Sequence, residues 1–288
     1  MSDVVRSPTA VRRELGQRLR GLRLAKEMTV AEASGQVGFS QSKLTKIELA
    51  QLVATRNDVL QLLDLYEETD PGQRELLLSM VRTGASKEWW EGRRALPPKF
   101  GSYLGLESVA ATLQAYSTTL VHGLLQTSDY ARALLRAERP ELLDHEIDAL
   151  VDLRMKRQEI LTRTDPPAPT LWWIMDEAVL RRQVGGRETM HAQLLQLVER
   201  SKLPNVTVLV MPDELGAHAG LAGPFTMLQF ETGTRPVVYV DCQAGNLYLE
   251  KDDDLRRCQQ TMNHILAAAP GPERSLALIR QVAREMKP

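Results

Sequence analysis

The chain has 288 residues, a net charge of -1 and 43% hydrophobic residues, so it is long enough for two domains that each bury a core. Its apolar runs fall short of the roughly 20 residues that a membrane-spanning helix needs, and its N-terminus lacks the apolar core of a signal peptide. Because two cysteines are too few for a secreted disulfide framework and five histidines show no metal-ligand spacing, we expect a cytoplasmic protein without membrane, metal or other cofactor.

Positive charge collects at the N-terminal end of the chain. Residues 1–60 carry ten Arg or Lys and six acids, a net charge of +4 that leaves -5 for the remainder. Such a block is often a solvated face, but with a matching fold it suits a nucleic-acid partner. A first helix is predicted over 11–26 by apolar residues at three-to-four spacing, namely Val11, Leu15, Leu19 and Leu22.

Two short helical patterns follow, with a break between them. Thr29 suits an N-cap, and Glu32 three residues later completes a capping box. Gly38 suits the left-handed end of that helix, Phe39 can pack between the two helices, and Ser40 caps the next one. The pattern predicts a helix-turn-helix.

The outer side of the third helix is polar. With Leu44 and Ile47 facing inward, its outward residues are Gln41, Ser42, Thr45 and Lys46. Gln can pair with adenine in the major groove, and Lys can donate to guanine acceptors. We expect Lys43 and the arginines of the first helix, Arg20 and Arg23, to contact phosphates, and we add Thr29 to the DNA-binding set. A polar-surfaced bundle, or a helix-turn-helix used for protein contacts, is the alternative.

The stretch LRLAKEMTVAEASGQVGFSQSKLTKIE, residues 22–48, resembles the DNA-binding domain of the Cro/repressor (Xre) type, with DVLQLLDLYE and PGQRELLLSMV as fourth and fifth helices. The resemblance implies that Gln41, Ser42 and Lys46 contact base edges and that Ser40 and Lys43 contact phosphates. The sequence departs from the family pattern at Val30, Ala50 and Ala54, where the family commonly has a polar residue, Gly and Pro.

The composition changes after residue 84. We predict a helix-turn-helix domain over 1–84, a connector over 85–106 whose Trp89 and Trp90 dock on a domain, and a C-terminal domain over 107–288. The last would begin with helices over ESVAATLQAYSTTL, TSDYARALLRA and a long segment from Asp144.

Five later segments read as strands: PTLWWIM, NVTVLVMP, GPFTMLQF, RPVVYVDC and GNLYLE. A helix over about 187–201 separates the first two, and short turns join the others, so we expect a mostly antiparallel five-stranded sheet. Two helices, over about 252–268 and 271–285, complete an α+β chain in which an all-α five-helix domain precedes a domain of helices and sheet.

The blocks LVHGLLQTSDYARALLRA, RMKRQEILTR, LWWIMDEAVLRRQVGG and GAHAGLAGPFTMLQF resemble a C-terminal domain of unknown function that follows an Xre-type domain in many actinobacterial regulators. The resemblance implies an antitoxin-like protein that binds a small partner protein encoded nearby. The sequence departs from the group at His122, where the group usually has Pro, and at Ala219.

A catalytic site is conceivable from Asp176 and Glu177 at a strand end and from Asp213, Glu214 and His218 in one loop. Turn capping and an ordinary polar loop explain these residues better, and the sequence lacks a phosphate-cradling loop or an activated nucleophile. We therefore expect no enzyme.

A ligand or partner site is expected in the C-terminal domain instead. Its candidate residues are Trp172, Trp173, Phe225, Tyr239 and His218, although such aromatics usually form core. The sequence thus predicts a transcriptional regulator that binds double-stranded operator DNA as a homodimer and is controlled by a small partner protein. The alternative is a regulator that senses a small molecule.

Overall fold

The computed structural model describes residues 7–88, 90, 100–231, 235–242 and 245–287. The chain divides into two compact units, here the N-terminal unit, Met1–Glu91, and the C-terminal unit, Gly92–Pro288. Of the expected connector, Trp89 and residues 91–99 lie outside the described residues, whereas Trp90 is buried. No helix in the described ranges is long and apolar enough to cross a membrane.

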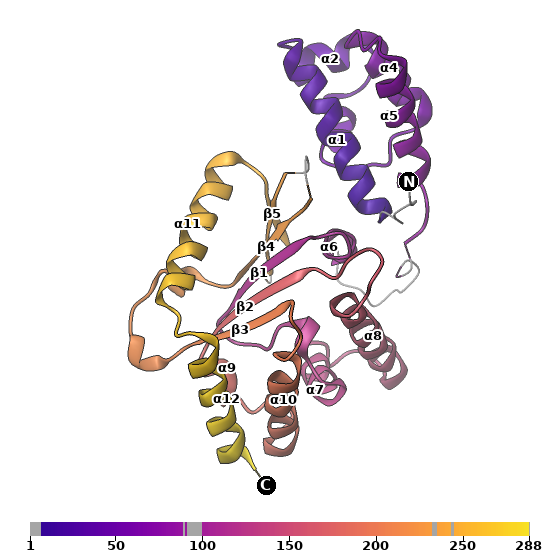
Figure 1. The fold of residues 1–288 in the computed structure, drawn as a ribbon. Coiled ribbons are helices and arrows are strands. Elements are labelled where there is room, and N and C mark those ends of the chain that lie inside the picture. The colour runs from indigo at the N-terminus through magenta and orange to yellow at the C-terminus, as the bar shows by residue number, and fades with distance from the viewer. Residues whose placement is uncertain (1–6, 89, 91–99, 232–234, 243–244, 288) are drawn as a thin grey trace. The chain divides into compact units, whose positions relative to one another are not determined.

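The N-terminal unit consists, over residues 7–88, of five helices (Figure 1). They are α1 (Pro8–Ala25), α2 (Val30–Gln36), α3 (Gln41–Glu48), α4 (Arg56–Leu65) and α5 (Pro71–Gly84). The predicted capping box is present, since Thr29 Oγ1 accepts from the Glu32 amide at 3.2 Å and Glu32 Oε2 accepts from the Thr29 amide at 2.7 Å. Gly38 has φ +69°, the left-handed geometry expected at the end of α2.

One close approach fixes α3 against α1. A Cβ on Gly16 would lie only 2.5 Å from the carbonyl oxygen of Glu48, so a larger residue would separate the two helices. Leu44 and Ile47 of α3 are buried in the same core as Leu19 of α1. The helix that carries the predicted DNA contacts is therefore rigidly seated.

The described part of the C-terminal unit is built on a mixed six-stranded sheet. Its strands are β1 (Thr112–Ser117), β2 (Thr170–Asp176), β3 (Val206–Met211), β4 (Phe225–Gln229), β5 (Val237–Val240) and β6 (Leu247–Leu249), in the order β3-β2-β1-β4-β5-β6. Its helices are α6 (Phe100–Glu107), α7 (Ser128–Glu138), α8 (Asp144–Arg157), α9 (Ala178–Arg181), α10 (Arg187–Arg200), α11 (Asp252–Ala268) and α12 (Pro272–Met286).

The expected five-stranded, mostly antiparallel sheet is therefore wrong in two respects. β1 lies within the segment predicted as a helix over 107–120, and it occupies the middle of the sheet between β2 and β4. β1, β2 and β3 are parallel, because helices cross over between them, while β4, β5 and β6 pair antiparallel. The five strands that the sequence predicts are all present.

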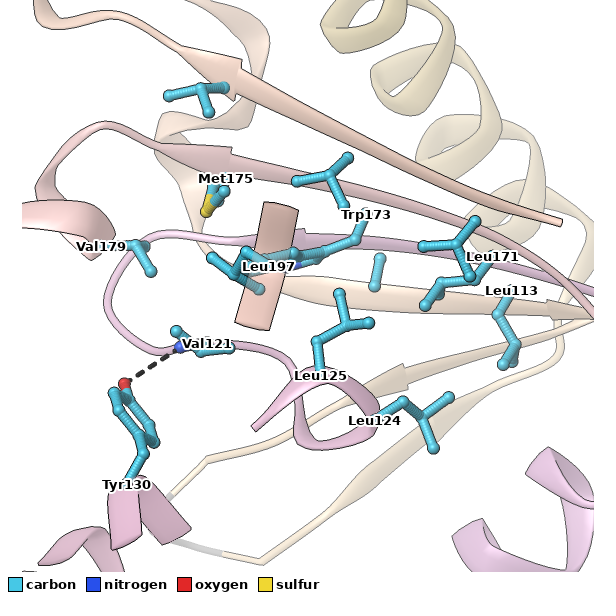
Figure 2. Close-up of a cluster of buried hydrophobic side chains, with 14 of the residues drawn as sticks. Leu113, Val121, Leu124, Leu125, Tyr130, Leu171, Trp173, Met175, Val179 and Leu197 are labelled. Atoms are coloured by element: carbon cyan, nitrogen blue, oxygen red, sulfur yellow. Dashed lines mark hydrogen bonds between the residues drawn. The ribbon is translucent and has the colours of Figure 1, made fainter. Parts of the chain in front are cut away.

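The sheet is covered on both faces (Figure 1). Side chains of α7, α10 and α12 pack on one face, which we call the large face, and Met262 and Ile265 of α11 pack on the other, the α11 face. Figure 2 shows part of the cluster on the large face, where the Val121 amide donates to the hydroxyl oxygen of Tyr130 at 3.2 Å. Each strand side chain in these clusters therefore points either to the large face or to the α11 face.

Candidate functional sites

α3 separates an apolar inner face from a polar outer one. Leu44 and Ile47 are buried, while the side chains of Gln41, Ser42, Thr45 and Lys46 are exposed. No hydrogen bond or ion pair joins these four side chains to any described residue. Arg20, Thr29 and Ser40 are also exposed, although the hydroxyls of the last two take part in capping their helices.

Arg23 has a different position from the other predicted DNA contacts. It is 5% exposed, and its Nε and Nη2 donate to the two carboxylate oxygens of Glu48 at 2.6 and 2.9 Å. Its Nη1 donates to the carbonyl oxygen of Met28 at 2.6 Å. The hydrogen bond to Glu48, opposed by burial, raises the pKa of Arg23. Arg23 therefore fastens the end of α3 to α1 and lies inside the unit, not on the outer surface of α3.

Lys43 is partly exposed, and its ammonium group pairs with a buried carboxylate. Its Nζ lies 2.6 Å from Oδ1 of the buried Asp58 and 4.0 Å from the centre of the Phe39 ring. Burial acts to raise the pKa of Asp58, but hydrogen bonds from Lys43 and Thr55 outweigh it and lower that pKa. Lys43 thus holds the first turns of α3 and α4 together.

Arg56 is a cation that the sequence reasoning missed. It is the exposed first residue of α4 and lies two positions before Asp58. Arg56 therefore belongs to the first turn of α4, which the Lys43–Asp58 hydrogen bond joins to α3. A cation at a helix N-terminus is unfavourable for the helix dipole, which is the sequence signal that could have identified it. An approaching phosphate would offset that cost.

The sheet distributes the expected ligand residues between its two faces. Trp173 and Tyr239 are buried on the large face, as Figure 2 shows for Trp173. Trp172 and Phe225 pack at the α11 face, and His218 lies beside Tyr116 of that face. Because strand neighbours point to opposite sides, these five residues do not line one pocket. The hydroxyl of Tyr239 has no hydrogen-bond partner.

His218 and Asp176, which the sequence offered as separate acid–base candidates, come together at the end of β2. His218 Nε2 lies 3.5 Å from Asp176 Oδ1, which also accepts a hydrogen bond from the Tyr116 hydroxyl at 2.6 Å. His218 Nδ1 accepts from the Gly220 amide at 3.2 Å. Every polar atom of the imidazole thus has a partner, and the arrangement holds the loop against the strand.

His122 lies in the interior of the C-terminal unit. Its Nδ1 accepts from the Leu124 amide at 3.3 Å, and burial, with a smaller contribution from Arg157, lowers its pKa to about 3. It therefore stays neutral near pH 7, so the histidine that replaces the group's usual proline is not a switch in that range.

A pocket of about 130 Å³ lies in the C-terminal unit, and sequence reasoning missed its polar lining. Its walls come from α6, from the end of α7, from α8 and from the residues flanking the β5–β6 connection. The polar residues that line it are Glu138, Arg139, Arg154, Arg157, Asp241 and Asn246. Arg154 and Arg157 continue the stripe of Leu150 and Leu153 on α8, and two arginines on a buried stripe are the signal that the sequence offered.

Comparison with known proteins divides the chain in a similar way. A model described as a helix-turn-helix domain matches residues 14–77, which agrees with a DNA-binding regulator. No curated protein and no solved structure matches the chain. A model described as a domain of unknown function (DUF5753) matches residues 100–281, more than half of the chain and most of the C-terminal unit. The chain belongs to the family defined by this domain of unknown function, DUF5753.

Proposed function

We propose that this protein is a sequence-specific transcriptional regulator of the Xre type that reads DNA with α3. The observation that carries the proposal is the contrast between the two faces of that helix. Its inner face and its C-terminal end are fixed by Leu44, Ile47 and the Glu48–Arg23 pair, whereas its outer polar side chains have no partner among the described residues. A rigid helix with an unpaired polar face suits a major groove.

The contacts divide into two chemical classes. Gln41, Ser42, Thr45 and Lys46 would meet base edges, where a good bidentate contact discriminates by about 1–3 kcal/mol. Phosphate contacts would come from Arg20, Thr29, Ser40, Lys43 and the additional cation Arg56. Arg23 is left out of the phosphate set, because its three guanidinium nitrogens are occupied inside the unit. The proposal assigns the chain no catalytic role.

The test is a selection of bound sequences from a random duplex library, followed by affinity measurements on the selected and on scrambled duplexes. Gln41→Ala should lose about ten-fold or more on the selected duplex and little on the scrambled one. Gln61→Ala, an exposed glutamine on α4, is the matched control and should change neither. An equal loss on both duplexes for Gln41→Ala, or failure to select any sequence, would contradict the proposal.

Dimerisation forms part of the same proposal. Two copies of α3 in successive major grooves would require half-sites about 10 base pairs apart, so the selected duplex should be an inverted repeat with that spacing. A single unrepeated half-site, bound with one protein per duplex, would exclude it.

A second candidate concerns control of the regulator, and the resemblance of the C-terminal blocks to antitoxin-like proteins supports it. We propose that a small partner protein encoded nearby binds the C-terminal unit. Native mass spectrometry of the untagged protein isolated from its own host should then show a second small chain at fixed stoichiometry. A spectrum that contains only this chain would count against a stable partner.

A further inference from the structure

We propose that the pocket between α6, α7, α8 and the two residues Asp241 and Asn246 binds a small zwitterion with an apolar side chain, the chemistry of an aliphatic α-amino acid. The inference rests on three observations: the size and apolar walls of the pocket, a buried amide without a partner together with an arginine that forms no ion pair with a described acid, and two carboxylates that form no ion pair with a described cation. Its regulatory meaning depends on the proposed DNA-binding function, but the binding itself does not.

Size restricts the ligand first. The pocket encloses about 130 Å³, slightly less than the roughly 150 Å³ of an engineered cavity that holds benzene. Its apolar walls are formed by Phe100, Leu104, Leu135, Leu150 and Leu153. A ligand with a branched side chain of three or four carbons fits such a volume, and a nucleotide or a peptide does not.

The donors lie on Arg154 and Asn246. Asn246 is 7% exposed, and its Nδ2 has no hydrogen-bond partner, which is costly for a buried amide. Arg154 donates through Nη1 to Gln126 Oε1 at 2.8 Å and forms no ion pair with a described acid. Burial, and then the nearby Arg157, lowers the pKa of Arg154 to about 10 against the smaller opposing effects of Glu138, Tyr130 and Asp241, so these neighbours compensate its charge only in part. A ligand carboxylate would satisfy both side chains.

The acceptors are Glu138 and Asp241. Both residues are exposed and line the pocket, and neither forms an ion pair with a described cation. Partial desolvation by neighbouring atoms raises the pKa of the Glu138 and Asp241 carboxyl groups, although Arg154 acts to lower it. A ligand ammonium would compensate them.

Ligands of a single charge fit less well. A simple anion would bind Arg154 and Asn246 but would be repelled by Glu138 and Asp241. A simple ammonium ion would bind Glu138 and Asp241 but would be repelled by Arg154. Arg157 does not change this balance, because Glu107 neutralises it. A molecule that carries both charges at one carbon meets both sets of groups at once.

The experiment is calorimetry on the full-length chain without DNA, with L-alanine, L-valine and L-leucine as probes. We expect at least one of these to bind. The matched analogues of L-leucine are 4-methylpentanoate, which lacks the ammonium, and 3-methylbutylamine, which lacks the carboxylate. Each should bind at least about ten-fold more weakly than the amino acid, since each leaves charged groups unpaired. Equal binding of either analogue, or no binding by any of the three amino acids, would overturn the proposal.

Two variants localise the site. Asp241→Asn, at an exposed position that should not disturb folding, and Asn246→Leu, which removes the buried amide, should each weaken binding about ten-fold or more. Asp152→Asn on the exposed side of α8 is the matched control and should bind as the parent does. An unchanged affinity in Asp241→Asn would overturn the assignment. Since no DNA is present, failure here is separate from failure of the DNA-binding proposal.

Discussion

The two units each contain a buried Arg–Glu pair, and the two pairs leave different amounts of hydrogen-bonding capacity unused. In the closed pair, Arg23–Glu48, all three guanidinium nitrogens donate within the N-terminal unit. In the open pair, Arg157–Glu107, Nε and Nη2 donate to Glu107, while Nη1 donates to no described residue and the guanidinium lines the pocket. In our proposals, the closed pair positions a helix whose outer surface binds DNA, and the open pair borders the ligand pocket.

The same contrast extends to the groups around each pair. The outer polar side chains of α3 are exposed, so water solvates them while no partner is bound. Asn246 Nδ2 is buried without a hydrogen-bond partner, which is unfavourable in the empty unit, and burial disfavours the charge of Arg154, which is not paired with any described acid. Satisfied buried groups should therefore control stability, and unsatisfied ones should control binding. The following predictions test this rule from the largest expected effect to the smallest.

The largest effect should come from breaking the closed pair. Glu48→Leu leaves Arg23 buried without a counter-charge, which should lower the free energy of unfolding of the N-terminal unit by about 3–5 kcal/mol. Glu107→Leu should lower the free energy of unfolding of the C-terminal unit by less, because Arg157 borders a pocket that water can enter. Arg157 Cζ also lies 5.6 and 5.2 Å from the ring centres of Phe100 and Tyr103, which stabilise its charge. Chemical denaturation with a separate probe for each unit measures both.

A double replacement provides the control. Arg23→Met combined with Glu48→Leu removes the uncompensated charge as well, so it should recover most of the stability that Glu48→Leu loses. If the double variant is as unstable as the single one, packing and not charge accounts for the loss. If Glu107→Leu costs as much as Glu48→Leu, the distinction between the closed and open pairs is wrong.

The next largest effect should separate two lysines three positions apart on α3. Lys43→Ala leaves the buried Asp58 without its cation and should lower the free energy of unfolding by about 1–3 kcal/mol, toward the low end because Lys43 is partly exposed. Lys46→Ala removes an unpaired exposed side chain and should change stability by no more than about 0.5 kcal/mol. Only the second should weaken selected DNA without destabilising the fold. Equal stability of the two variants would contradict this assignment.

The same pair predicts a smaller effect of pH. The pKa of Asp58 is lower in the folded chain than in the unfolded one, so its contribution to stability is complete above the unfolded value of about 3.9 and is lost as the pH falls through the folded value. The difference in unfolding free energy between the parent and Lys43→Ala should thus stay constant from pH 7 to about pH 5 and shrink as the pH falls below about 4. Thr45→Ala, which removes an exposed polar side chain of α3, should show no such dependence.

Local signals explain what could be predicted from the sequence. The capping box of Thr29 with Glu32 and the left-handed Gly38 depend on residues at most three positions apart, so the helix-turn-helix and its caps follow from the chain. The five strands that the sequence predicts, β2 to β6, are likewise short segments bounded by turn residues, and most are rich in β-branched or aromatic residues. These features depend little on distant contacts.

β1 could not be recognised, because a central strand buried on both faces loses the alternation that marks an exposed one. Leu113 and Tyr116 pack on opposite faces of the sheet, yet their three-residue spacing also fits a helix. Without β1, the parallel pairing of β1 with β2 could not be predicted either. The separation of Trp172 from Trp173, by contrast, follows from strand geometry, and applying the two-residue period would have placed them on opposite sides.

The pocket lay beyond sequence reasoning for a different reason. Arg154, Glu138 and Asp241 come from α8, α7 and the end of β5, and only the fold brings them to one cavity. The positions of the charges could not be inferred from spacing, because no pair of these residues belongs to one helix face or strand. The two arginines on the apolar stripe of α8, Arg154 and Arg157, were the one local signal.

The smallest expected effect concerns an exposed cation that carries no structural contact. Arg20 is exposed on α1 and has no partner among the described residues, so Arg20→Ala should leave stability within about 0.5 kcal/mol of the parent. If it meets one phosphate, the slope of log affinity against log salt should fall by about 0.9, with equal loss on selected and scrambled duplexes. Arg18→Ala is the matched control, because Arg18 is exposed on the same helix and paired with Glu14 at 2.8 Å. A slope unchanged by Arg20→Ala would place α1 away from the backbone and leave the phosphate contacts to α3 and to Arg56 of α4.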